Sequence, residues 1–378
     1  MSKSQIATGG IADDAVSTAK IFNDNRIVTP LIINGDMTVA QRATSASGLG
    51  ASSGYNTCDR WNFEKEGSPS ARFTQSQDTD VPTGQGFTTS LKMDCTTAAG
   101  SPDADDAISI QQKIESQNLQ LLRYGTSSAK KITLSFWVKA TKTGTNAIWI
   151  YQNDDNRSQA QTYTVNSSNT WEKKVVVFAA DTTGVIDNNN GEGFRINWWL
   201  TAGSNYTSGT LSTTWQSHVA ANNAVGQVNN ADSTSNNWYI TGVQLEVGEF
   251  DSDTIPPFPF ESFSNNLHKC RRYFVKSPKT DGLNHYALHD MFAYDNSNCF
   301  AGYIFNPPMR DAPSISQTTA AEFLTNGTDK SITTDMLYGS HKDNETARIR
   351  FYDGNAFSDQ NGKVGFLQNG TFIFESEL

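Results

Sequence analysis

The stretch KKITLSFWVKA, residues 130–140, alternates strictly from Ile132 onward. Successive side chains of a β-strand point to opposite faces of a sheet, so this alternation predicts a strand with one face in a core. Residues 146–152, 171–180, 193–203 and 237–248 have the same pattern. In the first stretch the predicted core face comprises Ile132, Leu134, Phe136 and Val138, and the opposite face comprises Thr133, Ser135, Trp137 and Lys139.

Polar, turn-rich stretches such as DNNNGEG (residues 187–193) and NNADSTSNN (residues 229–237) separate these strands. Asn, Asp and Gly favour turns because they tolerate unusual backbone angles or bond to their own backbone. Residues 108–125 predict a strand followed by a short helix, and no series of long helices alternates with the strands. The sequence therefore predicts the all-β class, with an antiparallel jelly-roll β-sandwich as its main body.

The composition changes along the chain and predicts three parts. Residues 1–28 are small and polar, and we expect them to order only against other proteins as an attachment tail. Residues 29–262 contain the predicted sandwich, which ends at the proline-rich joint IPPFPFES. Residues 263–378 predict a helical or extended connector and a small C-terminal β domain.

Charge and hydropathy exclude several functions. The 378 residues carry a formal net charge of −10, which argues against electrostatic binding of nucleic acid. A run of about 18 apolar residues is absent, so we predict no membrane insertion. The start MSKSQIATGG has no apolar segment of signal-peptide length, which predicts that the protein is not secreted by the ordinary route. The four cysteines form no CxxC pair and are predicted to be reduced and mostly buried.

Two motifs near the start of the predicted sandwich favour structural roles. Asn34-Gly35 predicts a tight turn in which glycine accepts a positive φ, with the first strand starting near Met37. Asp59-Arg60-Trp61 predicts a buried indole and an ion pair that seal the sandwich edge. A role of these three residues in ligand binding is the alternative.

Aromatic and amide side chains gather on one predicted strand face. Alternation turns Ile148 and Ile150 inward, so Trp149 and Tyr151 point outward. Flat rings and amides are the groups that recognise a sugar. The candidate glycan-binding residues are Trp149, Tyr151, Asn197, Trp199 and Tyr206. The alternative is that this face packs against a neighbouring subunit or the other domain, because an apolar patch of that size is costly to expose.

Several motifs resemble proteins of tailed-bacteriophage virions. IINGDMTVAQR with CDRW after it is similar to the opening of one such family, and SQIATGGIADDAVSTAKI resembles the leading segment of phage fibre proteins. CRRYFVKS, FNPPMRDAPSIS and FIFESEL resemble the end of the same family. The resemblance implies a structural or receptor-facing virion protein, assembled in the host cytoplasm, that attaches to other virion proteins through residues 1–28.

A second resemblance concerns the core strands. ISIQQKIE, TLSFWVKA and ITGVQLEVGEF resemble the carbohydrate-binding jelly rolls appended to xylanases and related hydrolases. Such jelly rolls often carry one calcium ion near the first and last strands, where this sequence has Asp36 and Glu246. The resemblance therefore implies a structural calcium site, and ordinary turn residues are the alternative.

These observations predict a non-enzymatic virion protein, a homotrimer by resemblance to phage fibres, that contacts host surface glycans from a tail fibre or the tail tip. A head fibre or capsid-decorating protein with an assembly role is the first alternative. A glycan-degrading spike is the second. It would need two carboxylates that face each other across the scissile bond, whereas the loop acids Asp103, Asp105 and Asp106 have no recognisable partner.

Overall fold

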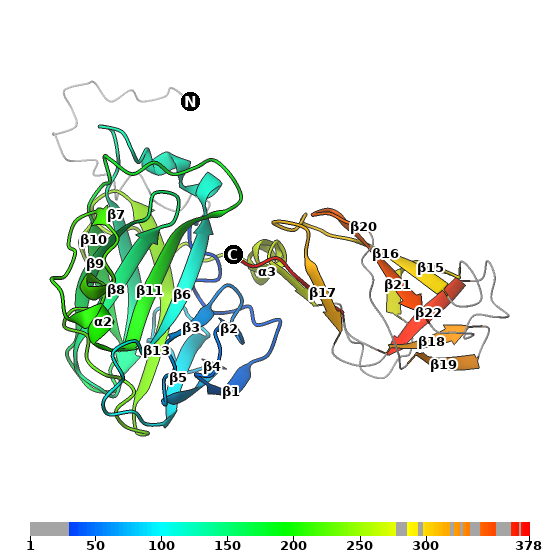
Figure 1. Cartoon of the computed structure of the whole chain (residues 1–378), viewed down its shortest axis with the longest axis horizontal. Coiled ribbons are helices and arrows are strands. Elements are labelled where there is room, and N and C mark those ends of the chain that lie inside the picture. Colours follow the sequence, from blue (N-terminus) through cyan, green and yellow to red (C-terminus); the bar gives the residue numbers. More distant parts are fainter. Residues whose placement is uncertain are drawn as a thin grey trace, which may run out of the picture.

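A computed structural model describes residues 30–276, 286–293, 298–317, 321–325, 328–332, 341–352, 364–369 and 372–378. The predicted tail, residues 1–28, lies outside the described residues. Every strand pair in the described chain is antiparallel. The all-β prediction is therefore confirmed, and Figure 1 shows a large sandwich beside a smaller group of strands.

Two facing sheets form the sandwich. Consecutive strands repeatedly change sheets, as in a jelly roll: β5 to β6, β6 to β7, β7 to β8, β9 to β10 and β10 to β11 all cross. The first sheet has the order β1 (Ser45–Leu49), β4 (Arg72–Asp78), β5 (Ser90–Thr97), β13 (Asn237–Val247), β7 (Ile132–Ala140) and β10 (Glu172–Phe178). The second has the order β12 (Gln216–Ser217), β9 (Arg157–Val165), β8 (Gly144–Gln152), β11 (Glu192–Ala202), β6 (Ala107–Glu115), β3 (Asn62–Glu66) and β2 (Gly54–Tyr55).

The core lies between these sheets and contains the residues that alternation predicts. All four predicted core residues of β7 are fully buried in it. Phe136 of β7 contacts Trp198 of β11 with ring centroids 5.9 Å apart, and Trp198 contacts Trp61 at 5.5 Å. Each large apolar side chain removed from water contributes about 1.5–3 kcal/mol. The helical turn η1 (Ser116–Leu122) follows β6, as predicted for residues 108–125.

The C-terminal strands form two further sheets. The three-stranded sheet has the order β14 (Phe274–Lys276), β23 (Phe372–Glu375) and β17 (Ser314–Gln317). The other has the order β19 (Thr328–Ile332), β18 (Ala321–Thr325), β22 (Val364–Asn369), β15 (Tyr286–Ala293), β16 (Asn298–Ile304), β21 (Thr346–Tyr352) and β20 (His341–Lys342). Phe374 stacks on Tyr303 with centroids 4.6 Å apart.

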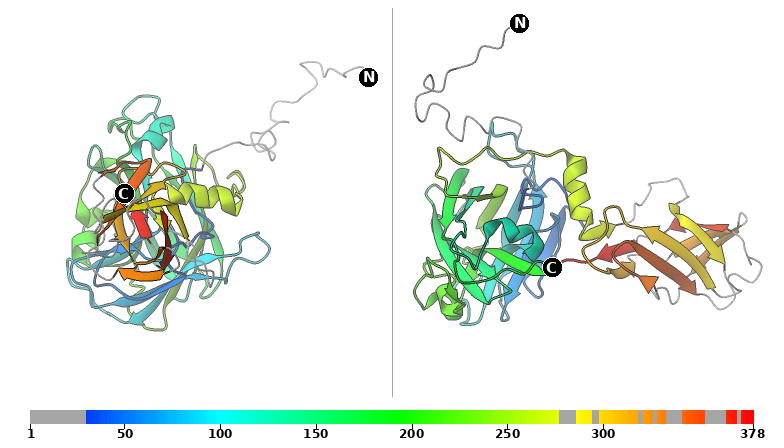
Figure 2. Two further views of the ribbon diagram at one scale, coloured as in Figure 1. Left: turned by 90° about the vertical axis from the view of Figure 1, so that its right-hand side faces the viewer. Right: turned by 90° about the horizontal axis from the view of Figure 1, so that it is seen from above.

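The helix α3 (Phe263–Arg271) lies between the sandwich and the C-terminal strands in Figure 2. The Ser262 hydroxyl caps it by accepting a hydrogen bond from the Asn265 N–H at 3.2 Å. Two shorter helices, α2 (Ser204–Thr207) and η2 (Ala220–Asn222), lie between β11 and β13 in the chain. Within the described residues, every helix is too short or too polar to cross a membrane.

The first turn differs from its prediction. Asn34 and Met37 have positive φ values, whereas Gly35 does not. Glycine is needed at position 35 for space, because a Cβ there would overlap the Val243 carbonyl oxygen. The prediction of a strand starting near Met37 was wrong. A residue at φ 60° cannot continue an extended strand, and the first strand starts at Ser45.

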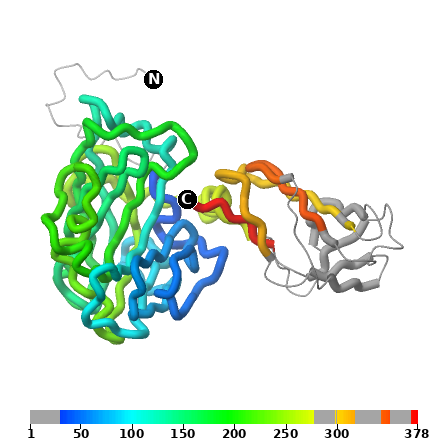
Figure 3. Tube along the Cα trace, in the orientation of Figure 1, coloured from blue at the N-terminus to red at the C-terminus, as the bar shows by residue number. Residues whose placement is uncertain are grey.

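The Asp59-Arg60-Trp61 motif is buried, as a sealing role requires. The Trp61 indole donates to the Asn34 carbonyl at 2.9 Å. Arg60 forms its ion pair with Glu377 near the end of the chain, and its guanidinium lies 3.5 Å from the centre of the Tyr273 ring. Figure 3 shows this C-terminal end beside α3. The motif therefore joins the sandwich to the C-terminal strands. The cysteines Cys58, Cys95 and Cys270 are free and buried.

Candidate functional site

The outer face of the second sheet carries the candidate site. Because β8, β11, β6 and β3 pair side by side, residues on this face form rows across the sheet. One row comprises Trp149, Asn197, Gln111 and Asn62. A second comprises Trp199, Ser109 and Glu64, and a third comprises Tyr151, Arg195 and Lys113. Strand register therefore brings residues from four separate segments onto one surface.

The five residues predicted to bind glycan line one cavity of about 280 Å³. The strands β8 and β11 supply four of them, and Tyr206 comes from α2. The rings of Trp149 and Tyr151 stack with centroids 5.3 Å apart, and those of Trp199 and Tyr206 lie 5.4 Å apart. His218 adds a further ring 5.4 Å from that of Trp149. Aromatic side chains thus make up much of the wall.

The chain itself covers this face, in place of the open platform that the sequence predicted. Trp149 and Trp199 are only 7 % and 4 % exposed. The segment after β11 folds back over the sheet, and two backbone hydrogen bonds hold it there. The Asn205 N–H donates to the Ala104 carbonyl at 2.9 Å, and the Ala224 N–H donates to the Tyr206 carbonyl at 2.9 Å. The apolar patch is therefore covered from within the domain, and a pocket remains.

The floor of the pocket contains buried polar atoms without partners. The Asn197 Oδ1 atom accepts hydrogen bonds from the Ser109 hydroxyl and the Gln111 Nε2 atom, both at 2.7 Å. An unsatisfied buried polar group costs about 1–3 kcal/mol. Within the described chain, five polar atoms of lining residues are buried and lack a partner: Asn197 Nδ2, Gln111 Oε1, Asn223 Oδ1 and the indole nitrogens of Trp149 and Trp199.

One end of the pocket is basic. Arg195 donates from Nε and a terminal nitrogen to the two oxygens of Glu192, at 2.9 and 3.2 Å. Burial disfavours the charge of Arg195, but the Glu192 carboxylate outweighs this and raises the pKa of Arg195. Lys113 lies 3.4 Å from the same carboxylate. Burial and the Arg195 charge lower the pKa of His218, so this ring favours its neutral form.

The other end is acidic. Glu64 and Glu66 share the outer face of β3, and both line the pocket. The Glu64 oxygens accept hydrogen bonds from Ser53 at 2.6 Å and from Asn62 at 2.8 Å. Much of the Glu66 residue is exposed, but its carboxylate is partly shielded from water. This shielding and the Glu64 charge raise the pKa of Glu66.

The two predicted calcium ligands lie in adjacent cavities. Asp36 accepts hydrogen bonds from the Thr38 hydroxyl and the Asn266 amide, both at 3.0 Å, and burial raises its pKa. Its cavity shares Pro30 and Gln244 with the one that Glu246 lines. In the part of the chain that the structure describes, no group of three or more His, Cys, Asp or Glu side chains could hold a metal ion. The calcium site stays a prediction.

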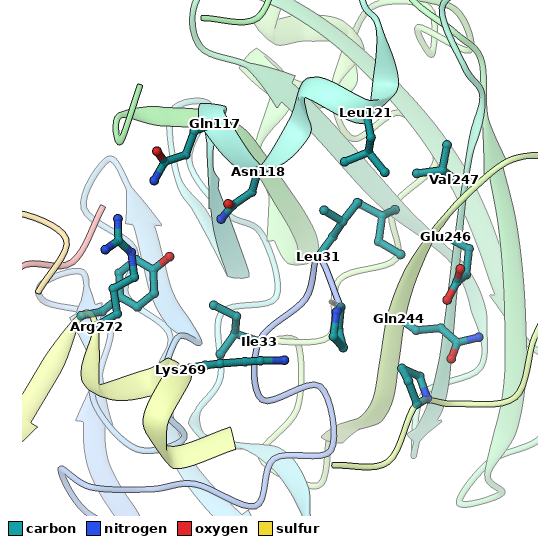
Figure 4. Close-up of a pocket in the computed structure, with 14 residues that line it drawn as sticks. Leu31, Ile33, Gln117, Asn118, Leu121, Gln244, Glu246, Val247, Lys269 and Arg272 are labelled. Atoms are coloured by element: carbon teal, nitrogen blue, oxygen red, sulfur yellow. The ribbon is translucent and has the colours of Figure 1, made fainter. Parts of the chain in front are cut away.

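The cavity that Glu246 lines is larger, about 880 Å³, and lies against α3. Figure 4 shows Leu31 at its centre, Leu121 and Val247 on one side, and Lys269 and Arg272 on the other. Pro30, the first residue that the structure describes, is among its lining residues. We place the candidate site in the smaller pocket, because aromatic faces and several unpartnered buried polar atoms occur there together.

Sequence reasoning missed several lining residues. Glu64, Glu66, Ser109 and Gln111 occupy the outward positions of two strands, and alternation around Phe63 and Ile110 could have identified them. His218 lies in an irregular segment that has no periodic signal. Its place over the Trp149 ring depends on the tertiary fold.

Searches of the sequence against protein-family models and against curated proteins find no match. Among solved structures, the enzymatically active domain of tailspike protein 4 from bacteriophage CBA120 is 14 % identical, with a TM-score of 0.30. That similarity covers 58 % of this chain and 21 % of the tailspike chain. The family 11 carbohydrate-binding module of cellulase Lic26A-Cel5E from Clostridium thermocellum is 11 % identical over 55 % of this chain and 98 % of the module, with a TM-score of 0.28.

A cyclase from Fischerella sp. TAU is 8 % identical over 59 % of this chain and all of the cyclase chain, with a TM-score of 0.32. At these values the similarities carry no argument about function.

Proposed function

We propose that this chain is a tailed-bacteriophage virion protein, a tail fibre or tail-associated adhesin, that binds host surface glycans without cleaving them. The observation that carries the binding proposal is the pocket of about 280 Å³ on the second sheet. A sugar ring has apolar C–H faces and a rim of hydroxyls that both donate and accept. The pocket supplies aromatic rings for the faces and unpartnered donors and acceptors for the hydroxyls.

The unpartnered polar atoms of the pocket are of both types that sugar hydroxyls can pair with. The two indole N–H groups and the Asn197 amide nitrogen donate, and the Gln111 and Asn223 oxygens accept. Each has almost no exposed surface in the unliganded chain, so a hydroxyl reaches it only when neighbouring side chains shift, and the contact then relieves the cost of an unmade hydrogen bond. An apolar ligand would leave these atoms unpaired and is therefore disfavoured.

The arrangement of charges supports binding without cleavage. Glycoside hydrolysis needs two carboxylates that flank the scissile bond. Glu64 and Glu66 lie two residues apart on one strand, and Arg195 and His218 lie on other elements of the pocket. Among the described lining residues these two are the carboxylates, and both come from β3, so they approach a ligand from the same side of the pocket.

The place on a phage particle is supported by the sequence resemblance given above. We propose a homotrimer that attaches to other virion proteins through residues 1–28. Many copies on one particle would raise the avidity of weak individual sites without new contacts. A head fibre or capsid-decorating protein with an assembly role is the alternative, because the same pocket could serve loose adhesion from the head.

Adsorption competition tests this proposal. Host cells are incubated with the purified full chain, phage is added, and free phage is counted. We expect the protein to reduce adsorption and the Tyr206→Ala variant to lose most of that effect. Tyr206 is half-buried and its hydroxyl makes one long hydrogen bond, 3.4 Å to the Asp105 carbonyl, so its removal should leave the fold intact.

The matched control is Trp171→Ala, which removes a half-buried aromatic ring beside Tyr239 on the first sheet. It should block adsorption as well as the unchanged protein does. Unchanged adsorption in the presence of folded protein would refute the adhesin role and favour the head-fibre alternative. Release of reducing sugar from host envelope would refute non-catalytic binding.

A further inference from the structure

We propose that the pocket selects a sugar that carries a free, positively charged amino group, with Glu64 and Glu66 beside Trp199 and Tyr206 as the residues that recognise this group. The inference rests on the proposed glycan binding and deepens it by naming the class of sugar. It follows from how charge is distributed in the pocket.

The negative charge at the β3 end is not neutralised by a cation in direct contact. The hydrogen bonds of Glu64 come from Ser53 and Asn62, which are both neutral. Glu66 makes no ion pair or hydrogen bond within the described residues, and the nearby Lys65 ammonium donates to the Gly67 carbonyl at 2.7 Å. Shielding from water and then the Glu64 charge raise the pKa of Glu66, and the charges of Arg195 and Lys65 oppose this shift without reversing it. A ligand cation would relieve this repulsion.

Aromatic faces lie at the same end. The Trp199 and Tyr206 rings are tilted by 37° with centroids 5.4 Å apart. Burial, followed by the Glu66 charge, raises the pKa of Tyr206, which is consistent with Glu66 lying close to this ring. A cation over an aromatic face gains about 0.5–2 kcal/mol, depending on how far water is excluded. Carboxylates and aromatic faces together are suited to an ammonium group.

The opposite end sets the orientation of the sugar. Arg195 lines this end and is held by both oxygens of Glu192. Lys113, outside the lining, lies 3.4 Å from that carboxylate and donates to the Leu378 oxygen at 2.9 Å, so the charged group that faces the pocket here is the Arg195 guanidinium. An ammonium group is repelled there and attracted to Glu66. The sugar hydroxyls then lie over the central row, where Asn197 and Gln111 supply an unpartnered donor and acceptor. An N-acetyl group would remove the charge and add bulk.

The volume limits the ligand to a small one. Pockets for small molecules generally have volumes of about 300–1,000 Å³, and 280 Å³ is at the lower limit. One sugar residue, free or at a chain end, is therefore the matching probe. This is why the test uses monosaccharides.

The experiment is a saturation-transfer NMR titration of the full chain at pH 7 with glucosamine, glucose and N-acetylglucosamine. We expect glucosamine to bind most tightly. The Glu66→Gln variant should weaken glucosamine binding by roughly three- to tenfold, the range of a partly exposed charge interaction with an aromatic contribution. The same variant should weaken glucose binding by a smaller factor, because glucose has no charge to lose its partner. Glu66 is largely exposed, so the substitution should not affect folding.

The matched control is Glu249→Gln, which removes one exposed carboxylate paired with Lys131 outside the pocket. It should leave all three titrations unchanged. If glucosamine binds no better than glucose, or if both variants behave alike, the amino-sugar inference is refuted while glycan binding stands. If none of the three sugars binds, the inference fails, and the adsorption assay decides separately whether the adhesin role survives.

Discussion

Replacing the two amides in the pocket floor should stabilise the protein and abolish sugar binding. The variant combines Gln111→Leu and Asn197→Leu with Ser109→Ala, which removes the buried hydroxyl that would otherwise lose its acceptor, Asn197 Oδ1. It removes the Asn197 Nδ2 and Gln111 Oε1 atoms, which are buried and without partners in the described chain. We expect this because, in our proposal, these atoms pair with a bound ligand. A protein selected for stability alone would gain stability by replacing them.

The expected size follows from the contacts. Each unpartnered atom costs about 1–3 kcal/mol while it stays buried, and its removal returns that free energy. The substitutions also delete two hydrogen bonds to Asn197 Oδ1, each of which contributes about 1 kcal/mol. The free energy of unfolding should therefore increase by about 2 kcal/mol, which corresponds to a rise in Tm of about 4–8 °C for a sandwich of this size.

Tryptophan fluorescence is the appropriate assay, because all eight tryptophans lie in residues 61–238 and report on the sandwich. The matched control is Thr57→Val with Gln75→Leu. That pair is also buried and hydrogen-bonded, at 2.9 Å, and the Gln75 Nε2 atom also lacks a partner, but neither residue lines the pocket. It should raise the Tm and leave sugar binding unchanged. A fall in Tm for the pocket variant, or unchanged binding, would show that the amides serve the fold and not a ligand.

Two further predictions concern the frame of the sandwich. Gly35→Ala should lower the free energy of unfolding by about 2 kcal/mol in urea titration, because its Cβ would overlap the Val243 carbonyl oxygen, and an unchanged value would contradict the close approach. Glu115→Gln should cost about 2–3 kcal/mol at pH 7, because the buried Glu115 carboxylate accepts two hydrogen bonds at 2.7 Å from Arg272. Burial opposes this charge, but the hydrogen bonds from Arg272 and Tyr273 outweigh it and lower the pKa of Glu115 below 4.5. The ionised form therefore stabilises the fold above about pH 4.5. The difference in free energy of unfolding between the unchanged protein and the Glu115→Gln variant should shrink as the pH falls below that value. A difference that does not change with pH would refute the stabilising role of the ionised carboxylate.

The strands of the sandwich were largely predictable, since alternation has one physical cause. A strand that covers a core must turn every second side chain inward, and β7, β8 and β11 follow this rule closely. The same rule correctly assigned Trp149, Tyr151, Asn197 and Trp199 to one outward face. The turn at Gly35 was misread, because local sequence gives the usual reason for a glycine, a positive φ. The actual reason is contact with Val243, a residue more than 200 positions away.

The pocket could not be predicted as a pocket, because its depth comes from residues that are small. Ala107, two residues before Ser109, and Ala220 both line the cavity. Small side chains beside the aromatic rings leave room under the covering segment that contains Tyr206. Sequence reasoning gave weight to aromatic residues and none to alanines on the same face. The alanines decide whether an aromatic face is flat or concave, and a concave face with unpaired amides is the feature that distinguishes a binding site from a packed surface.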